Sequence, residues 1–146
     1  MENNAHAPIG LFDSGIGGLT VANAMMIQLP NESLIYFGDT AHLPYGDKSA
    51  DTIRYFTKTI GAFLMSKECK IIVIACNTAS AVAYEMLQNM AGDKAKVFSV
   101  IDPVVDEVIQ KKYKKVGVIG TLGTVNSKAY FNKIKEKDAS VEVQQL

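Results

Sequence analysis

The chain has 146 residues, 48% of them hydrophobic, and its 15 basic side chains balance 15 acidic ones. This length has room for one ordinary domain, and a net charge of zero gives no electrostatic reason to expect nucleic acid or a membrane as partner. No apolar run approaches the ~20 residues that cross a bilayer, and residues 1–8 have no signal-peptide pattern. We therefore expect a cytoplasmic protein.

The two cysteines, Cys69 and Cys76, are expected to act separately. One predicted strand lies between them and would hold them roughly 20 Å apart, far beyond the reach of a disulfide bond. The two histidines, His6 and His42, lack the spacing of metal ligands, so no metal site is expected.

Short apolar runs alternate with segments of helical periodicity along the chain. In residues 50–67, for example, Ile53, Phe56 and Ile60 share one helical face. The continuous apolar run at 70–75 is typical of a strand that is buried on both faces of a parallel sheet. This alternation predicts an α/β fold with a doubly wound parallel sheet. Strands are expected at 9–12, 33–37, 70–75, 96–100, 116–120 and 141–143, and helices at 19–29, 50–67, 78–90, 103–112 and 127–137.

A weak domain boundary is expected near Ile101-Asp102-Pro103. We predict a first α/β domain over residues 1–100 and the beginning of a second, similar α/β domain over residues 101–146. The last predicted strand has no helix after it, so we expect the second domain to be incomplete and more protein to follow in the natural gene.

Polar residues follow most of the predicted strands. Open parallel α/β sheets bind ligands at the carboxyl ends of their strands, so these residues are candidates for a site. Cys69 falls at the opposite end of its strand and is interpreted as structural. The candidates, in chain order, are Asp13 and Ser14; Asp39, Pro44, Tyr45 and Gly46; Cys76, Asn77 and Thr78; Asp102; and Thr121 and Thr124.

Cys76 lies between a buried strand and the start of a predicted helix. Unpaired N–H groups at a helix N-terminus stabilise a thiolate, which is both a nucleophile and a base. Asn77 and Thr78 are also ordinary capping residues. The local sequence therefore leaves a reactive thiol and a structural one equally open.

The glycine-rich turn over residues 15–18 has two interpretations. Glycines let the backbone approach a ligand closely, but the segment is also a plain turn that Asp13 or Ser14 could cap. A dinucleotide site is disfavoured, because Thr20 replaces the third glycine and Asp13 would repel a pyrophosphate. The loop over residues 44–46 is equally consistent with a surface turn and with a ligand-binding loop.

Together these segments resemble the glutamate racemases of the aspartate/glutamate racemase superfamily. The likeness covers nearly the whole chain, and the order of the segments is that of the family. The matching segments are IGLFDSGIGGLTV (9–21), YFGDT (36–40) with LPYG (43–46), IACNTASA (74–81), and GVIGT (117–121) with Thr124, Val125 and Tyr130.

The resemblance implies an enzyme without cofactor or metal that interconverts L- and D-glutamate and supplies D-glutamate for peptidoglycan and cell shape. Two cysteines would flank the α-carbon, one thiolate removing its proton while the opposite thiol returns one. Cys76 matches the cysteine that acts on the D-enantiomer, and Asp13 is placed to tune it. The substrate-binding positions that the resemblance implies are Asp13, Ser14, Pro44, Tyr45, Gly46, Asn77, Thr78 and Thr121.

The family's second cysteine and its supporting glutamate are absent from the sequence. Cys69 cannot replace that cysteine, so we expect the chain alone to be inactive. Two alternatives stay open: a related racemase or isomerase acting on aspartate, hydantoins or maleate, and a non-catalytic glutamate-binding fragment. Because family members are often homodimers, a dimer is expected.

Overall fold

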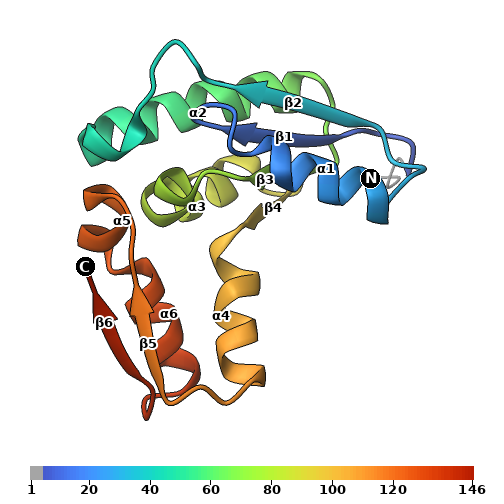
Figure 1. Ribbon diagram of the computed structural model, residues 1–146. Helices are drawn as coiled ribbons and strands as arrows, with labels where there is room; N and C mark the ends of the chain where they lie inside the picture. Colours follow the sequence, from blue (N-terminus) through green and yellow to red (C-terminus); the bar gives the residue numbers. More distant parts are fainter. Residues whose placement is uncertain (1–4) are drawn as a thin grey trace.

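The computed structural model describes residues 5–146 as alternating strands and helices (Figure 1). This arrangement confirms the predicted α/β fold with parallel strands. The strands are β1 (Ile9–Asp13), β2 (Leu34–Gly38), β3 (Ile71–Ile74), β4 (Lys96–Ser99), β5 (Lys115–Val118) and β6 (Glu142–Gln145). The helices are α1 (Leu19–Gln28), α2 (Ala50–Ser66), α3 (Asn77–Ala91), α4 (Ile101–Gln110), α5 (Leu122–Ser127) and α6 (Ala129–Lys137), with a 3₁₀ turn η1 (Tyr45–Asp47).

Within the described residues, β1 to β4 form one parallel sheet in the order β2-β1-β3-β4. The chain leaves β1 through α1 to reach β2 on one side, and then returns through α2 to β3 on the other side. The strand order thus reverses between β1 and β3. In sheets of this kind, the crevice outside the carboxyl ends at the reversal point is where ligands bind.

Helices cover both faces of this sheet, because side chains alternate along each strand. Leu11 of β1 packs with Ala22 of α1 on one face, whereas the next residue, Phe12, joins the core on the opposite face. Helix α2 buries one stripe of its surface there, and Ser49 caps it by accepting the Thr52 N–H at 3.2 Å. The larger core comprises Phe12, Tyr45, Ile53, Ile60, Leu64, Cys69, Ile72, Ile74, Cys76, Ala79, Leu87, Ala91, Ala95 and Val97.

The rest of the chain packs around a second, smaller parallel pair, β5 and β6. Helix α4 leads from β4 toward this pair, and α6 lies beside α4 (Figure 1). Ala81 of α3 also packs against this cluster, so the two cores are neighbours. The boundary between two domains at residue 100 stays a prediction. The buried members of the second cluster are Ile101, Val105, Val108, Ile134 and Val141.

Two helices differ from the sequence expectation. The predicted helix over 127–137 begins only at Ala129, after Lys128 with a positive φ of 55°, and the separate helix α5 precedes it. Gly123, Thr124 and Asn126 are weak helix formers, so pattern reasoning did not predict α5. Helix α4 starts at Ile101 and not at Pro103, since a proline in the first turn costs no hydrogen bond.

Candidate active site

Strand β1 ends at Asp13, whose buried carboxylate organises the glycine-rich turn. Its Oδ2 accepts the backbone N–H of Gly15 at 3.2 Å and that of Gly18 at 3.0 Å. Only glycine fits at position 18, because a Cβ there would lie 2.6 Å from the Cβ of Asp13. Asp13 therefore fixes the path of the chain from β1 into α1, and it places Ser14 at the carboxyl edge of the sheet.

Cys76 caps the N-terminus of α3 with its own side chain. Its Sγ accepts the Ala79 N–H at 3.4 Å, and its thiol donates to the Ser14 Oγ, also at 3.4 Å. The residue is only 5% exposed. Its sulfur therefore lies at the N-terminus of α3, where backbone N–H groups carry partial positive charge. The two central strands thus bring Asp13, Ser14 and Cys76 together at the reversal point.

The loop after β2 is tied to the loop after β1. The Asp39 N–H donates to the Asp13 carbonyl at 2.9 Å. The Asp39 carboxylate accepts the Tyr45 hydroxyl at 2.6 Å, and its other oxygen lies 2.7 Å from His42 Nδ1. Burial, and then the hydrogen bond to Asp39, raise the pKa of Tyr45 well above its ordinary value, so this hydroxyl stays protonated. The Tyr45 side chain is therefore turned into the protein.

Tyr36, from β2, lies close to the same groups. Its hydroxyl donates to the Gly15 carbonyl at 3.0 Å. Burial raises the pKa of Tyr36, and the nearby Asp13 and Cys76 raise it further. A neutral tyrosine thus covers the glycine-rich turn.

Three threonine hydroxyls join the start of α3 to the start of α5. Thr78 Oγ1 lies 2.9 Å from Thr121 Oγ1, and Thr124 Oγ1 lies 3.1 Å from the same Thr121 atom. Thr121 also caps α5 by accepting the Thr124 N–H at 3.2 Å. Gly46 packs directly against this group, since a Cβ there would lie 2.6 Å from Thr121 Cγ2. We call Thr78, Thr121 and Thr124 the threonine seam.

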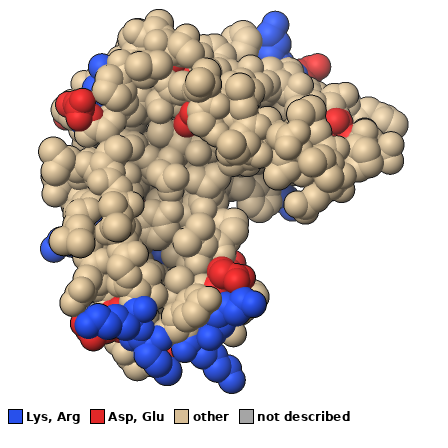
Figure 2. Space-filling model, viewed as in Figure 1, with Lys and Arg blue, Asp and Glu red and all other residues tan. Residues whose placement is uncertain are grey.

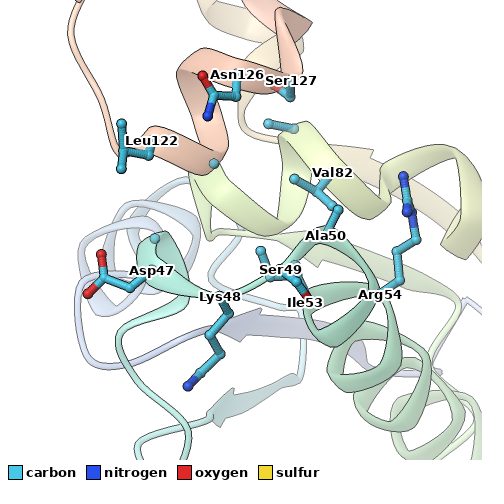
Figure 3. Close-up of a pocket in the computed structure, with 13 residues that line it drawn as sticks. Asp47, Lys48, Ser49, Ala50, Ile53, Arg54, Val82, Leu122, Asn126 and Ser127 are labelled. Carbon is cyan, nitrogen blue, oxygen red and sulfur yellow. The ribbon is translucent and has the colours of Figure 1, made fainter.

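Asn77 is exposed beside the seam. Its Oδ1 accepts the Tyr130 hydroxyl at 2.7 Å, which leaves its NH₂ group to donate elsewhere. Asn77 and Thr78 line a cavity of about 450 Å³ with the threonines at the start of α5 and the apolar flank of β5. A second cavity, of about 510 Å³, separates α5 from the start of α2 (Figure 3). Leu122 and Asn126 face it from one side, and Lys48 points away from it.

The predicted site residues are therefore distributed over three connected places. Cys76 contacts Ser14, which directly follows Asp13 in the chain, and Thr78 contacts Thr121. Of the other four positions, Gly46 packs against Thr121 and Asn77 is exposed beside the seam. Tyr45 is buried, and Pro44, which follows a cis peptide bond, is exposed. Sequence reasoning placed Asp39 and Thr124 at strand ends but gave them no role. The partners of Asp39 lie on an irregular loop without periodicity, and Thr124 lies on an unpredicted helix, so no local signal identified them.

In Figure 2 the lysine and arginine side chains gather mostly at the far end of the smaller sheet, away from the first sheet. Within residues 5–146, no three His, Cys, Asp or Glu side chains come close enough to bind a metal ion. None of the helices in that range combines the length and the apolar character that a membrane span requires.

The fold and the site define a class of α/β protein with a thiol at the reversal point of a parallel sheet. Residues 20–146 match the family model described as Asp/Glu/Hydantoin racemase. The chain belongs to this family.

Several relatives of similar sequence are glutamate racemases. The glutamate racemase of Chlorobium phaeobacteroides is 49% identical over 138 residues, which are 94% of this chain and 50% of that protein. The glutamate racemase of Lactococcus lactis subsp. lactis is 46% identical over 140 residues, covering 95% of this chain and 51% of that protein. The chain thus spans about half the length of the curated relatives it matches.

Solved structures give the same result. Glutamate racemase from Francisella tularensis, solved in complex with D-glutamate, superposes with a TM-score of 0.91 at 46% identity, over 96% of this chain and 52% of that one. The RacE1 isoform of glutamate racemase from Bacillus anthracis also gives 0.91, at 40% identity and the same coverage. An aspartate racemase homologue from Pyrococcus horikoshii, 18% identical, shares the fold with a TM-score of 0.70.

Proposed function

We propose that this chain supplies one of the two acid–base thiols of a glutamate racemase, and that this thiol is Cys76. The position of Cys76 carries the proposal: its sulfur lies at the reversal point of the sheet, against Ser14 and the N-terminus of α3. Membership in the racemase family supports the same reaction class.

The proposed chemistry needs no redox step. The Cys76 thiolate takes the α-proton of D-glutamate, so the C–H bond breaks, an S–H bond forms, and the electron pair moves into the carboxylate. A second thiol on the opposite face then protonates the α-carbon and completes the inversion. The developing charge requires hydrogen-bond donors fixed in advance at the carboxylate.

This chain offers such donors around Cys76. The free NH₂ of Asn77 and the backbone N–H groups of the loops are suited to a carboxylate, and the Ser14 hydroxyl adds a further polar contact. The Asp13 carboxylate is suited to holding the substrate ammonium while it keeps the turn in place. We propose Thr78, Thr121 and the loop over residues 44–46 as the remaining wall of this site.

The second thiol has to come from outside these 146 residues. The other cysteine, Cys69, is buried against Gly10 and Leu64 at the opposite end of β3, and burial raises the pKa of its thiol. We therefore propose that the chain alone does not racemise glutamate. We also propose that the complete enzyme is a homodimer that works in the cytoplasm without a cofactor. It would bind neither membranes nor nucleic acid, and it would provide D-glutamate for peptidoglycan.

Proton NMR in D₂O tests the proposal. The α-proton signals of D- and L-glutamate are followed, together with optical rotation, for this chain, for the complete gene product and for its C76S variant. We expect exchange with racemisation by the complete product alone, and a loss of at least about a hundredfold in the variant. No exchange by the complete product would reject a glutamate racemase, and the same spectra with aspartate would identify the related activity.

A further inference from the structure

We propose that Asp39 is a positioning residue that holds the loop over residues 44–46 in its substrate-binding shape through the Tyr45 hydroxyl. That this loop binds glutamate rests on the function proposed above. The contact between Asp39 and Tyr45 does not depend on that function. Asp39 itself is not expected to touch the substrate.

The contact between Asp39 and Tyr45 is a buried hydrogen bond. Asp39 is 7% exposed and Tyr45 is 1% exposed, so both polar groups have left water. Their 2.6 Å hydrogen bond is short, as expected for a hydroxyl donating to a carboxylate. A buried carboxylate is costly without such a donor, and a buried hydroxyl is costly without such an acceptor. Each group therefore needs the other.

Aromatic packing supports the hydrogen bond between Asp39 and Tyr45, and we call this bonded pair the clamp. The Tyr45 ring lies 5.6 Å from Phe56 of α2, and the His42 ring stacks on the same phenylalanine at 4.3 Å. His42 also places Nδ1 2.7 Å from the second Asp39 oxygen. The loop is thus held from one side by a carboxylate and from the other by the start of α2.

The clamp decides which groups the loop can offer to a ligand. The Tyr45 hydroxyl is already bonded to Asp39 and its ring lies in the core, so the exposed groups near the seam are those of the backbone around Gly46. Position 46 has no room for a side chain, because Thr121 fills the space where a Cβ would be. Loss of the clamp would therefore disturb the loop's backbone and its contact with the seam together.

Asp39 also connects the loop over residues 44–46 to the glycine-rich turn that follows β1. Its own N–H donates to the Asp13 carbonyl at 2.9 Å, which continues the pairing of β1 with β2 beyond Gly38. One residue thus fixes the loop relative to the turn that carries Ser14. This is the geometry expected of a residue that positions binding groups without contacting the ligand.

The kinetic test uses the complete enzyme with D39A, D39N, Y45F and the double variant D39A/Y45F. D47N is the matched control, since Asp47 is an exposed acid on the same turn, pointing away from α5 in Figure 3. We expect D39A and Y45F each to raise KM for glutamate about tenfold, the scale of one buried hydrogen bond to a charged group, while kcat changes less than about threefold. The double variant should be no worse than either single one.

The D39N variant distinguishes a positioning role of Asp39 from a role of its negative charge. The Asn oxygen of D39N can still accept the Tyr45 hydroxyl, so this variant should recover most of the KM that D39A loses. Circular dichroism and melting curves at the assay temperature confirm that the variants are folded. An unchanged KM in D39A, or effects of D39A and Y45F that add in the double variant, would overturn the inference.

Hydrogen exchange decides the inference even if the enzyme does not act on glutamate. The Lys48 N–H donates to the Tyr45 carbonyl at 3.1 Å, so it reports on the turn that the clamp holds. We expect its protection in this chain to fall about tenfold in D39A and Y45F but not in D47N. Equal protection in all variants would refute the clamp, whereas inactivity of the wild-type enzyme would refute only the proposed function.

Discussion

The sulfur of Cys76 lies 3.4 Å from the hydroxyl oxygen of Ser14, although the two residues are 62 positions apart in the chain. Parallel pairing of β1 with β3 creates this contact, because it brings the carboxyl ends of both strands to one edge. Both cysteines belong to the larger core, but Cys76 also meets the polar Ser14 at this edge, whereas Cys69 lies at the other end of β3.

This difference predicts selective alkylation. Iodoacetamide near neutral pH should modify Cys76 and leave Cys69 unmodified, because burial raises the pKa of the Cys69 thiol and keeps it protonated. Peptide mass mapping of the wild type, C69A and C76A identifies the modified residue. D-glutamate should slow the reaction if the proposed site is correct. Faster modification of Cys69 than of Cys76 would contradict the assignment.

The threonine seam predicts a graded loss of stability. Thr78→Val removes hydroxyl bonds and should lower the free energy of unfolding by about 1 kcal/mol. Thr121→Val also removes the cap of α5, so its loss should be larger, roughly 2 kcal/mol. Thr59, exposed on α2, bonds only within its own helix, and Thr59→Val should stay within about 0.5 kcal/mol. Urea unfolding measures all three, and equal effects at positions 59 and 121 would argue against the seam.

Gly18 is expected to tolerate no side chain. In Gly18→Ala the new Cβ would lie 2.6 Å from the Asp13 Cβ and 3.0 Å from the Ala75 Cβ, atoms attached directly to the backbone. Overpacking of this kind costs roughly 1–3 kcal/mol. Gly117→Ala is the control, because a Cβ there meets nothing within 4 Å. Thermal unfolding compares the two variants, and a wild-type melting temperature for Gly18→Ala would show that the turn can move.

Stability should fall at alkaline pH. Burial raises the pKa of Tyr45, Tyr36 and Tyr130 above the ordinary tyrosine value of about 10 that holds in the unfolded chain. The unfolded state therefore releases protons first, and the folded state loses stability as pH rises above about 10. Below that pH this contribution is fully present.

Tyr45→Phe isolates one part of this dependence. The variant should be less stable than the wild type below pH 10, because it lacks the bond to Asp39, and its stability should fall less steeply above that pH. Urea midpoints between about pH 8 and pH 11 give both slopes. Parallel slopes would mean that Tyr45 ionises in the folded protein as easily as in the unfolded chain.

Much of the architecture could be predicted from local sequence. The apolar run before Cys76 predicts a strand, which the structure has as β3, and the periodicity of residues 50–67 with the Ser49 cap predicts α2. These features depend on residues close in the chain, which is why the order of the strands and of the other helices was predicted. Helix α5 was missed because Gly123 and its polar neighbours have low helix propensity, and its stability comes from the Thr121 cap and from contacts with η1 and α3.

Local sequence is enough to predict that a thiol follows one apolar strand and that a carboxylate and a serine follow another. The contacts of Cys76 with Ser14 and of Thr78 with Thr121, and the turn of the Tyr45 hydroxyl toward Asp39, become visible only in the folded chain. The reason is physical. Periodicity and capping act over a few residues, whereas these hydrogen bonds depend on which strands pair and on which polar groups the packed core leaves to be satisfied.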